Sequence, residues 1–342
     1  MKRQLSRTAY FRLGRVPVRI GAVLKGWDLT EDRFRNPDTL NVVDCRIMTA
    51  KCDHDCRHCY TDKQRSDLPL DLQLGIISQI AEMGAHAIDF LGEGEPTLDS
   101  HFLEVVEHTV ALGVQPVIFT DAATKLRDTV LTRRLNDLGV TVVPKCDSLF
   151  NADYQNWVVR DETGTYFGQR NEAIDLLVEE GFNAVNDEGT TRLGFDMVVT
   201  TRNLGEIEQT LRYCRERNMW IVFCPFIPAG RTGEKGVGDE QIESLALSPD
   251  QRWFLAETVR RVDLEYGFDH PICSNFVTGV CVELVQIYGD GRVSTCPGNE
   301  VIVGNIRDTP LSELYRRIIE LYPSHHCTTF DGNCPYRPPI VE

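Results

Sequence analysis

The sequence predicts an α/β protein: a partial (βα)6 TIM-like barrel followed by a small C-terminal α+β domain. Between about residues 40 and 230, short β-rich runs alternate with longer amphipathic runs, which is the pattern of parallel βαβ units. There are six β-rich runs, fewer than the eight of a closed barrel, so we expect the barrel to be open. Beyond the barrel, five of the twelve cysteines gather between residues 273 and 334, which indicates a second unit.

The six predicted strands are short and rich in Val, Ile and Phe, as buried parallel strands are. They span 41–48, 86–91, 115–120, 140–145, 193–200 and 220–226. Amphipathic helical patterns follow the first five of them, and several of these patterns end in glycine, a common helix stop. The helical patterns span 72–84, 102–113, 129–139, 170–181 and 204–218. Catalytic groups in such folds gather at the carboxyl ends of the strands.

The predicted boundaries follow the changes in composition along the chain. Residues 1–39 form an N-terminal extension without a recognisable motif, and residues 40–235 form the barrel. A Gly-rich, charged segment at 228–244 predicts a linker, and a further helix is expected at 248–267. Residues 236–342 then hold the linker and the small domain, which includes a hairpin at 285–296 with Asp290-Gly291 at its turn.

Composition narrows the classes of partner. Hydrophobic residues make up 42% and charged residues 25% of the chain, as in ordinary globular proteins. A net charge of -15 disfavours nucleic acid and anionic membranes as partners. No apolar run has the length of a membrane span or of a signal peptide, so we expect a cytoplasmic protein. In a reducing compartment, clustered cysteines are more often metal ligands than disulfides.

Three cysteines lie directly after the first predicted strand. Cys52, Cys56 and Cys59 follow the spacing CxxxCxxC and are followed at once by Tyr60. A zinc site needs a fourth ligand, and we expect the intervening His54 and His58 to turn away in so tight a loop. A 4Fe–4S cluster held by three cysteines instead leaves one iron open to another ligand. A structural zinc loop remains the alternative.

This motif in a loop after the first strand resembles the signature of the radical S-adenosylmethionine (SAM) superfamily. The resemblance implies that Cys52, Cys56 and Cys59 hold a 4Fe–4S cluster whose open iron binds SAM, and that Tyr60 contacts the adenine. It also implies reductive cleavage of SAM to a 5′-deoxyadenosyl radical that abstracts a hydrogen atom from the substrate, with an electron donor such as flavodoxin or ferredoxin.

A second motif supports the resemblance. The segment Gly92, Glu93, Gly94, Glu95 and Pro96 follows the second strand and resembles the family's GGEP motif, with Glu93 as a departure. Its glycines let backbone carbonyls approach the SAM amino group, and Glu95 can hold the turn. Taken alone, the segment could be an ordinary turn between strand and helix.

Later strand ends provide further candidates for cofactor contacts. By the resemblance, Lys145 and Ser148 at the end of the fourth strand lie near the SAM carboxylate or ribose. Asn203 after the fifth strand is either a ribose contact or the N-cap of the next helix. Arg231 after the sixth strand either pairs with a carboxylate or is solvated.

The cysteines of the C-terminal segment form a second group. The spacing from Cys281 to Gly291 and on to Cys296 resembles the opening of the SPASM and twitch extensions, which bind auxiliary 4Fe–4S clusters. Only five cysteines are available, so one auxiliary cluster is expected, held by Cys273, Cys281, Cys296 and either Cys334 or Cys327. Cys334 is the favoured fourth ligand, and a structural zinc site is the alternative.

The resemblance leaves the substrate open. We expect a small polar substrate, such as a sugar or an aminoglycoside precursor of an antibiotic, that undergoes dehydrogenation or epimerisation. The acidic surplus of the chain fits a cationic substrate. Cys224, at the end of the sixth strand, is the candidate catalytic thiol of an epimerase, with Cys146 as a competitor; a buried structural cysteine is the alternative. Maturation of a ribosomal peptide or protein is the alternative function.

Overall fold

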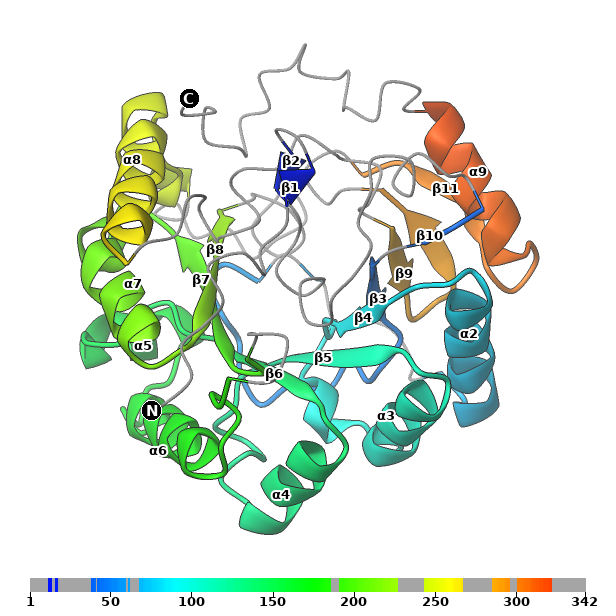
Figure 1. The fold of residues 1–342 in the computed structure, drawn as a ribbon, viewed down its shortest axis with the longest axis horizontal. Helices are drawn as coiled ribbons and strands as arrows, with labels where there is room; N and C mark the ends of the chain where they lie inside the picture. Colours follow the sequence, from blue (N-terminus) through cyan, green and yellow to red (C-terminus); the bar gives the residue numbers. More distant parts are fainter. Residues whose placement is uncertain are drawn as a thin grey trace.

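The computed structural model describes residues 12–13, 16–17, 38–40, 42–59, 61, 68–185, 191–226, 243–266, 285–295 and 300–321. It is a mixed α/β fold in which helices surround a mostly parallel array of strands (Figure 1). The strands are β1 (Arg12–Leu13), β2 (Val16–Pro17), β3 (Val42–Arg46), β4 (Ala87–Phe90), β5 (Gln115–Thr120), β6 (Thr141–Pro144), β7 (Gly194–Val199), β8 (Trp220–Pro225), β9 (Gln286–Tyr288), β10 (Arg292–Ser294) and β11 (Ile302–Asn305).

Six parallel strands form the partial barrel, as the sequence predicts. Strands β3, β4, β5 and β6 pair in order, and β7 pairs with β8. Two isolated parallel bridges, Val142 to Leu193 and Lys145 to Asp196, join β6 to β7. The predicted fold class is therefore confirmed.

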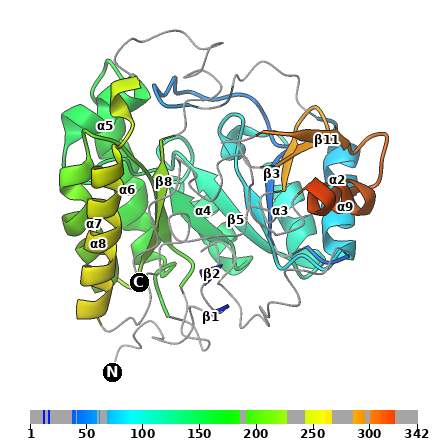
Figure 2. The ribbon, with the colours of Figure 1, turned by 90° about the horizontal axis from the view of Figure 1, so that it is seen from above.

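The helices cover the outside of this array. They are α2 (Leu70–Glu82), α3 (Phe102–Ala111), α4 (Thr129–Asp137), α5 (Ala152–Val159), α6 (Tyr166–Glu179), α7 (Ile207–Glu216), α8 (Pro249–Glu265) and α9 (Leu311–Leu321), with 3-10 turns η2 (Pro96–Leu98), η3 (Leu204–Glu206) and η5 (Glu243–Leu245). Helices α5 to α8 gather beside β8, whereas α2, α3 and α9 gather near β3 and β11 (Figure 2). The expected glycine stops are present: Gly84 and Gly139, each at φ 73°, end α2 and α4.

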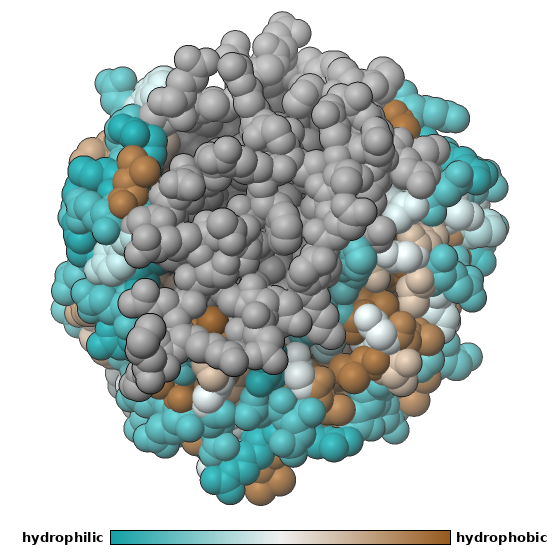
Figure 3. Space-filling view, in the orientation of Figure 1, coloured by the Kyte–Doolittle hydropathy of each residue, from teal (hydrophilic) through white to brown (hydrophobic). Residues whose placement is uncertain are grey.

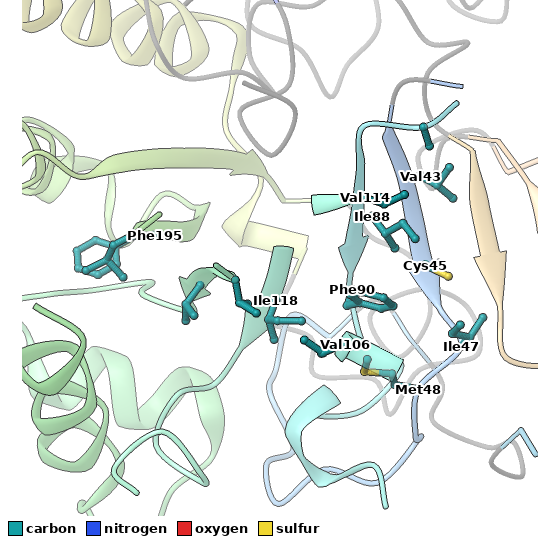
Figure 4. Close-up of a cluster of buried hydrophobic side chains, with 14 of the residues drawn as sticks. Val43, Cys45, Ile47, Met48, Ile88, Phe90, Val106, Val114, Ile118 and Phe195 are labelled. Carbon is teal, nitrogen blue, oxygen red and sulfur yellow. The ribbon is translucent and has the colours of Figure 1, made fainter. Parts of the chain in front are cut away.

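The outward faces of the strands pack on the helices to form the core. Val43 and Cys45 of β3, Ile88 and Phe90 of β4, and Ile118 of β5 are fully buried and lie together in Figure 4. This places Cys45 in the core, where its thiol acts as a small apolar group.

The C-terminal hairpin extends the barrel sheet. β9 pairs in parallel with β3, and β10 and β11 follow in antiparallel order, so the sheet runs β11-β10-β9-β3-β4-β5-β6. The predicted turn is present, with Gly291 at φ 86° and its N–H donating to the Tyr288 carbonyl over 2.9 Å. The side chain of Arg46 on β3 donates to Gln286 on β9 over 2.7 Å, so buried polar contacts tie the two strands as well.

Figure 3 shows one face of the molecule. The described residues around its rim are mostly hydrophilic and are interrupted by separate apolar patches. This agrees with the predicted globular character of the chain. None of the helices within the described ranges is long and apolar enough to cross a bilayer.

Candidate functional site

The three cysteines of the first motif lie on the loop that leaves β3, which we call the cysteine loop (residues 50–61). Cys52, Cys56 and Cys59 are half-buried and form no disulfide with another described cysteine. The Cys59 Sγ lies 3.2 Å from the Thr61 hydroxyl, which in turn donates to the Glu93 carbonyl over 2.9 Å. The loop thus brings three soft sulfur donors to the carboxyl end of β3 and ends against the second motif. Tyr60 lies outside the described residues.

The second motif packs directly against the first. The Gly94 N–H donates to the Thr49 carbonyl over 3.2 Å, and the Glu95 N–H donates to the Lys51 carbonyl over 2.7 Å. A Cβ atom on Gly94 would lie 2.0 Å from the Lys51 carbonyl oxygen, and one on Gly92 would lie 1.8 Å from the Gly94 oxygen. Only glycine fits at these two positions, because real Cβ atoms do not approach backbone so closely.

Glu95 holds the turn that follows the glycines. Its carboxylate accepts from the Thr97 N–H and hydroxyl over 3.1 and 2.7 Å, from the Thr120 hydroxyl over 2.7 Å and from the Asp121 N–H over 2.7 Å. Burial, followed by the charge of Asp121, raises the pKa of Glu95 to about 8, although the hydrogen bonds oppose this shift. Glu95 therefore ties the end of β4 to the end of β5, and Pro96 begins the 3-10 turn η2 behind it.

The two histidines of the cysteine loop face carboxylates on neighbouring strands. His54 Nε2 lies 3.3 Å from the Asp121 carboxylate, which follows β5. His58 Nε2 lies 3.2 Å from the Asp147 carboxylate, which follows β6. The prediction that the histidines turn away from the metal motif fits these positions, but the sequence did not reveal that they fasten the loop to two strand ends.

Helix α5 provides a further platform for the cysteine loop. The Arg57 backbone N–H donates to the Val158 carbonyl over 2.8 Å, and its Nε donates to the Trp157 carbonyl over 2.9 Å. The Arg57 guanidinium also lies over the Trp157 ring, 4.6 Å from its centre. Arg160, just after α5, pairs with Asp55 at 3.4 Å. Sequence reasoning missed this helix, although Asn151 is a recognisable N-cap that accepts from the Tyr154 N–H.

The fourth and fifth strand ends contain the other predicted cofactor contacts. Ser148 is fully buried, and its hydroxyl donates to Glu206 over 2.6 Å. Asn203 is also fully buried; its amide nitrogen donates to the Asp147 and Val198 carbonyls over 2.8 Å each, and its oxygen accepts from the Thr200 N–H over 2.7 Å. Asn203 stands at the N-cap position of η3 but makes no capping hydrogen bond there. Both side chains are engaged in holding the loops after β6 and β7.

Lys145 lies at the end of β6 between two carboxylates. Its Nζ is 3.0 Å from the Asp196 Oδ2 and 3.3 Å from the Asp147 Oδ1. Burial lowers the pKa of Lys145, but the two carboxylates outweigh burial and hold the pKa above its ordinary value. Burial alone would raise the pKa of Asp147, but the charges of Lys145 and His58 outweigh burial and hold this pKa below its ordinary value. Lys145 is therefore an ammonium and Asp147 a carboxylate.

Cys224 joins this cluster from β8. Its Sγ donates to the Asp196 Oδ1 over 3.0 Å, and it is half-buried. Its competitor Cys146 is fully buried in the core among apolar side chains, and burial raises the pKa of that thiol to about 11. Of the two predicted catalytic thiols, Cys224 is the one with a polar environment.

The remaining predicted site residues lie outside the described residues. They are Arg231 and the five cysteines of the second group, Cys273, Cys281, Cys296, Cys327 and Cys334. Their roles stay predictions. Within the part of the chain that the structure describes, no three His, Cys, Asp or Glu side chains converge on one ion-sized point.

The chain is similar in fold to solved structures of other proteins. No protein-family model and no curated protein matches the chain. Among solved structures, anSMEcpe with bound AdoMet and a peptide superposes with a TM-score of 0.62 at 15% identity, covering 88% of this chain and 92% of that one. SuiB from Streptococcus suis bound to S-adenosylmethionine superposes with a TM-score of 0.56 at 14% identity, covering 81% of this chain and 66% of that one.

The chain shares the fold of these two proteins, a partial barrel of parallel strands surrounded by helices. At these identities the likeness concerns the arrangement of strands and helices, and the two motifs identified from the sequence lie at the strand ends where this fold gathers its chemistry.

Proposed function

We propose that the chain is a radical SAM enzyme that abstracts a hydrogen atom from a small polar substrate. The observation that carries the proposal is the packing of the two motifs: a loop with three cysteines lies against a glycine turn in which Gly94 packs on the backbone of residues 50–51. Two sequence signals of one family, forty residues apart in the chain, thereby form one site.

The donor set fits an iron–sulfur cluster. Three half-buried thiols on one loop provide three thiolate ligands, Cys52, Cys56 and Cys59, and leave one iron of a 4Fe–4S cluster for SAM. When bound, the cluster and SAM supply the 5′-deoxyadenosyl radical. The chain's own contribution is to hold the loop, through His54, His58 and Arg57, against three neighbouring elements.

The residues that we predicted to bind SAM fall into two groups: those that contact SAM and those that hold the contacting residues in place. We infer that the backbone of Gly92 to Pro96 and the side chain of Lys145 face SAM, together with Tyr60 and Arg231. Ser148 and Asn203 act from behind, because their side chains are buried against Glu206 and the Asp147 carbonyl. For the C-terminal cysteines we retain one auxiliary 4Fe–4S cluster, with Cys334 favoured over Cys327.

We infer that the substrate is a small amine-bearing sugar or aminoglycoside-like molecule, as in antibiotic biosynthesis. Two carboxylates, Asp147 and Asp196, surround the single ammonium of Lys145, so this wall carries a net negative charge that favours a cation. Epimerisation would use Cys224: its S–H bond breaks homolytically and a C–H bond forms on the substrate radical. One electron from the flavodoxin or ferredoxin donor and one proton would then return the thiyl radical to the thiol. Dehydrogenation would leave Cys224 unused.

Peptide or protein maturation is the second candidate function. The observation that favours it is the bound peptide of anSMEcpe, whose fold this chain shares over 88% of its length. A screen of amino-sugar precursors and of peptides, read by product mass, separates the two. Loss of two hydrogens indicates dehydrogenation, an unchanged mass with a new stereoisomer indicates epimerisation, and loss of water indicates dehydration.

We infer that the protein is cytoplasmic, so the test uses protein that is expressed in a reducing cytoplasm and purified anaerobically. Reduced flavodoxin or ferredoxin serves as the electron donor. We expect about eight irons per chain for two clusters and cleavage of SAM on reduction. Replacement of Cys52, Cys56 and Cys59 by Ala should remove about four irons and abolish SAM cleavage, whereas Cys224→Ala should retain both. Stoichiometric zinc without iron, or SAM cleavage by the triple variant, would contradict the proposal.

A further inference from the structure

Three consecutive strands bring a thiol, a carboxylate and an ammonium into contact. Cys224 lies near the end of β8, Asp196 lies in the middle of β7, and Lys145 follows β6. The thiol donates to the Asp196 Oδ1 over 3.0 Å, and the Lys145 ammonium donates to the Asp196 Oδ2 over 3.0 Å. Both oxygens of one carboxylate are thus used, one by the thiol and one by the ammonium.

These side chains lie on the inner wall of the barrel, the side of the strands away from the outer helices. Phe195 and Met197, the neighbours of Asp196 in β7, are fully buried in the core. Because successive side chains of a strand point to opposite faces, Asp196 points inward. The register of β7 and β8 places Val198 opposite Cys224 and therefore Cys224 on the same face as Asp196. The Asp196 side chain is 17% exposed and that of Lys145 21%.

The charged groups around the Cys224 thiol favour its protonated form. Asp196 touches it directly, and beyond Lys145 lies Asp147, which also faces His58. Two carboxylates against one ammonium leave a net negative surrounding, which disfavours a thiolate. Lys145 donates to the Oδ2 of Asp196, which leaves the Oδ1 to accept the S–H.

We propose that Asp196, paired with Lys145, is a positioning residue that keeps Cys224 as a thiol with its hydrogen fixed on the inner wall. The proposal rests on the proposed function, in which Cys224 gives a hydrogen atom to a substrate radical. A thiolate has no hydrogen atom to give, so a neighbouring carboxylate, which would impair a nucleophilic cysteine, suits a hydrogen donor. The polarity of the site therefore assigns Cys224 to hydrogen donation and not to covalent attack.

The test is the rate at which iodoacetamide alkylates Cys224 in the anaerobically purified, iron-loaded protein, followed by peptide mass at a fixed pH of about 8, near the ordinary thiol pKa. Only the thiolate reacts, so the rate reports the protonation of the thiol. We expect Asp196→Asn to react about tenfold faster, the change that one pKa unit produces. Lys145→Gln should react more slowly, because two carboxylates then remain without their ammonium. Asp196→Glu should restore a rate close to that of the unmodified protein.

Controls separate this effect from loosening of the fold. Asp175→Asn removes an exposed carboxylate on α6 and should leave the rate unchanged. Cys146 and Cys214 are fully buried, so they stay unreacted in any variant that remains folded. Equal rates in Asp196→Asn and the unmodified protein would overturn the proposal, as would acceleration in both Asp196→Asn and Lys145→Gln. If Asp196→Asn fails to fold, the slower rate expected for Lys145→Gln still decides the matter.

The same samples distinguish failure of the inference from failure of the proposed function. Cluster ligands are shielded from alkylation, so Cys52, Cys56 and Cys59 should be protected until iron is removed. Modification of these three in the loaded protein would count against the proposed function, whatever the behaviour of Cys224. Protected ligands with a Cys224 rate insensitive to Asp196 would count against the inference alone.

Discussion

Gly94 packs closely against the backbone that leads into the cysteine loop. Its N–H donates to the Thr49 carbonyl, and a side chain on it would collide with the backbone of Ala50 and Lys51. Since backbone cannot yield as a flexible side chain can, any substitution must part the glycine turn from the cysteine loop. The geometry of the three thiols thus depends on a residue that has no side chain.

Gly94→Ala should therefore lower both the stability of the fold and its iron content. We expect a loss of about 1–3 kcal/mol of unfolding free energy, the usual cost of overpacking, and weaker retention of iron. The matched control is Gly75→Ala on α2, where a Cβ meets nothing within 4 Å and helix propensity should add about 0.5–1 kcal/mol. Thermal unfolding and iron analysis are measured for both variants. Equal melting temperatures of Gly94→Ala and Gly75→Ala would contradict the close packing of Gly94.

Single residues of the site were predictable where the chemistry is local. Three thiols at close spacing and a glycine turn are legible in the sequence, and so is the role of Glu95 in holding that turn. The partners of His54 and His58 were not, because Asp121 and Asp147 lie 67 and 89 positions further along the chain. Cys224 was predicted as a candidate thiol, but its carboxylate neighbour Asp196 depends on the register of β7 and β8.

At the scale of secondary-structure elements, helix α5 supports the cysteine loop. It was absent from the prediction because its 8 residues are too few for a periodic pattern to be recognised. The six barrel strands and helices α2, α3, α4, α6, α7 and α8 were predictable from their periodicity, whereas α9 was not predicted. Helix α5 matters because the carbonyls of Trp157 and Val158, at its carboxyl end, accept from Arg57.

Arg57→Gln should make the cysteine loop release its metal more readily. The variant loses the Nε bond to the Trp157 carbonyl and the stacking on the Trp157 ring, which are together worth about 1–2 kcal/mol, while the backbone bond to Val158 remains. We expect iron to be removed by a ferrous chelator several-fold faster. Arg133→Gln, which removes an exposed ion pair between α4 and Glu180 at the end of α6, is the control. Unchanged release in Arg57→Gln would show that α5 does not support the loop.

At the scale of the whole molecule, the C-terminal hairpin belongs to the barrel sheet. The sequence predicted the hairpin and its turn, because both are local, but the parallel pairing of β9 with β3 joins residues more than 240 positions apart and left no local signal. The predicted boundary near residue 236 stays a prediction. Strand β9, which lies in the sequence between Cys281 and Cys296 of the second group, therefore pairs with the strand that leads to the first group.

This continuity predicts how the molecule unfolds. Ile287 of β9 is fully buried in the same core as β3 and β4, so Ile287→Ala should cost about 2–5 kcal/mol. In a continuous sheet that loss is global, and hydrogen exchange should accelerate in β3, β4 and β5 as well as in the hairpin. Ile302→Ala, on the exposed side of β11 where the side chain is 43% accessible, should change little. Acceleration confined to residues 285–321 would instead identify the hairpin and α9 as an independently unfolding unit, and the coupling of the two cysteine segments through β3 would be lost with it.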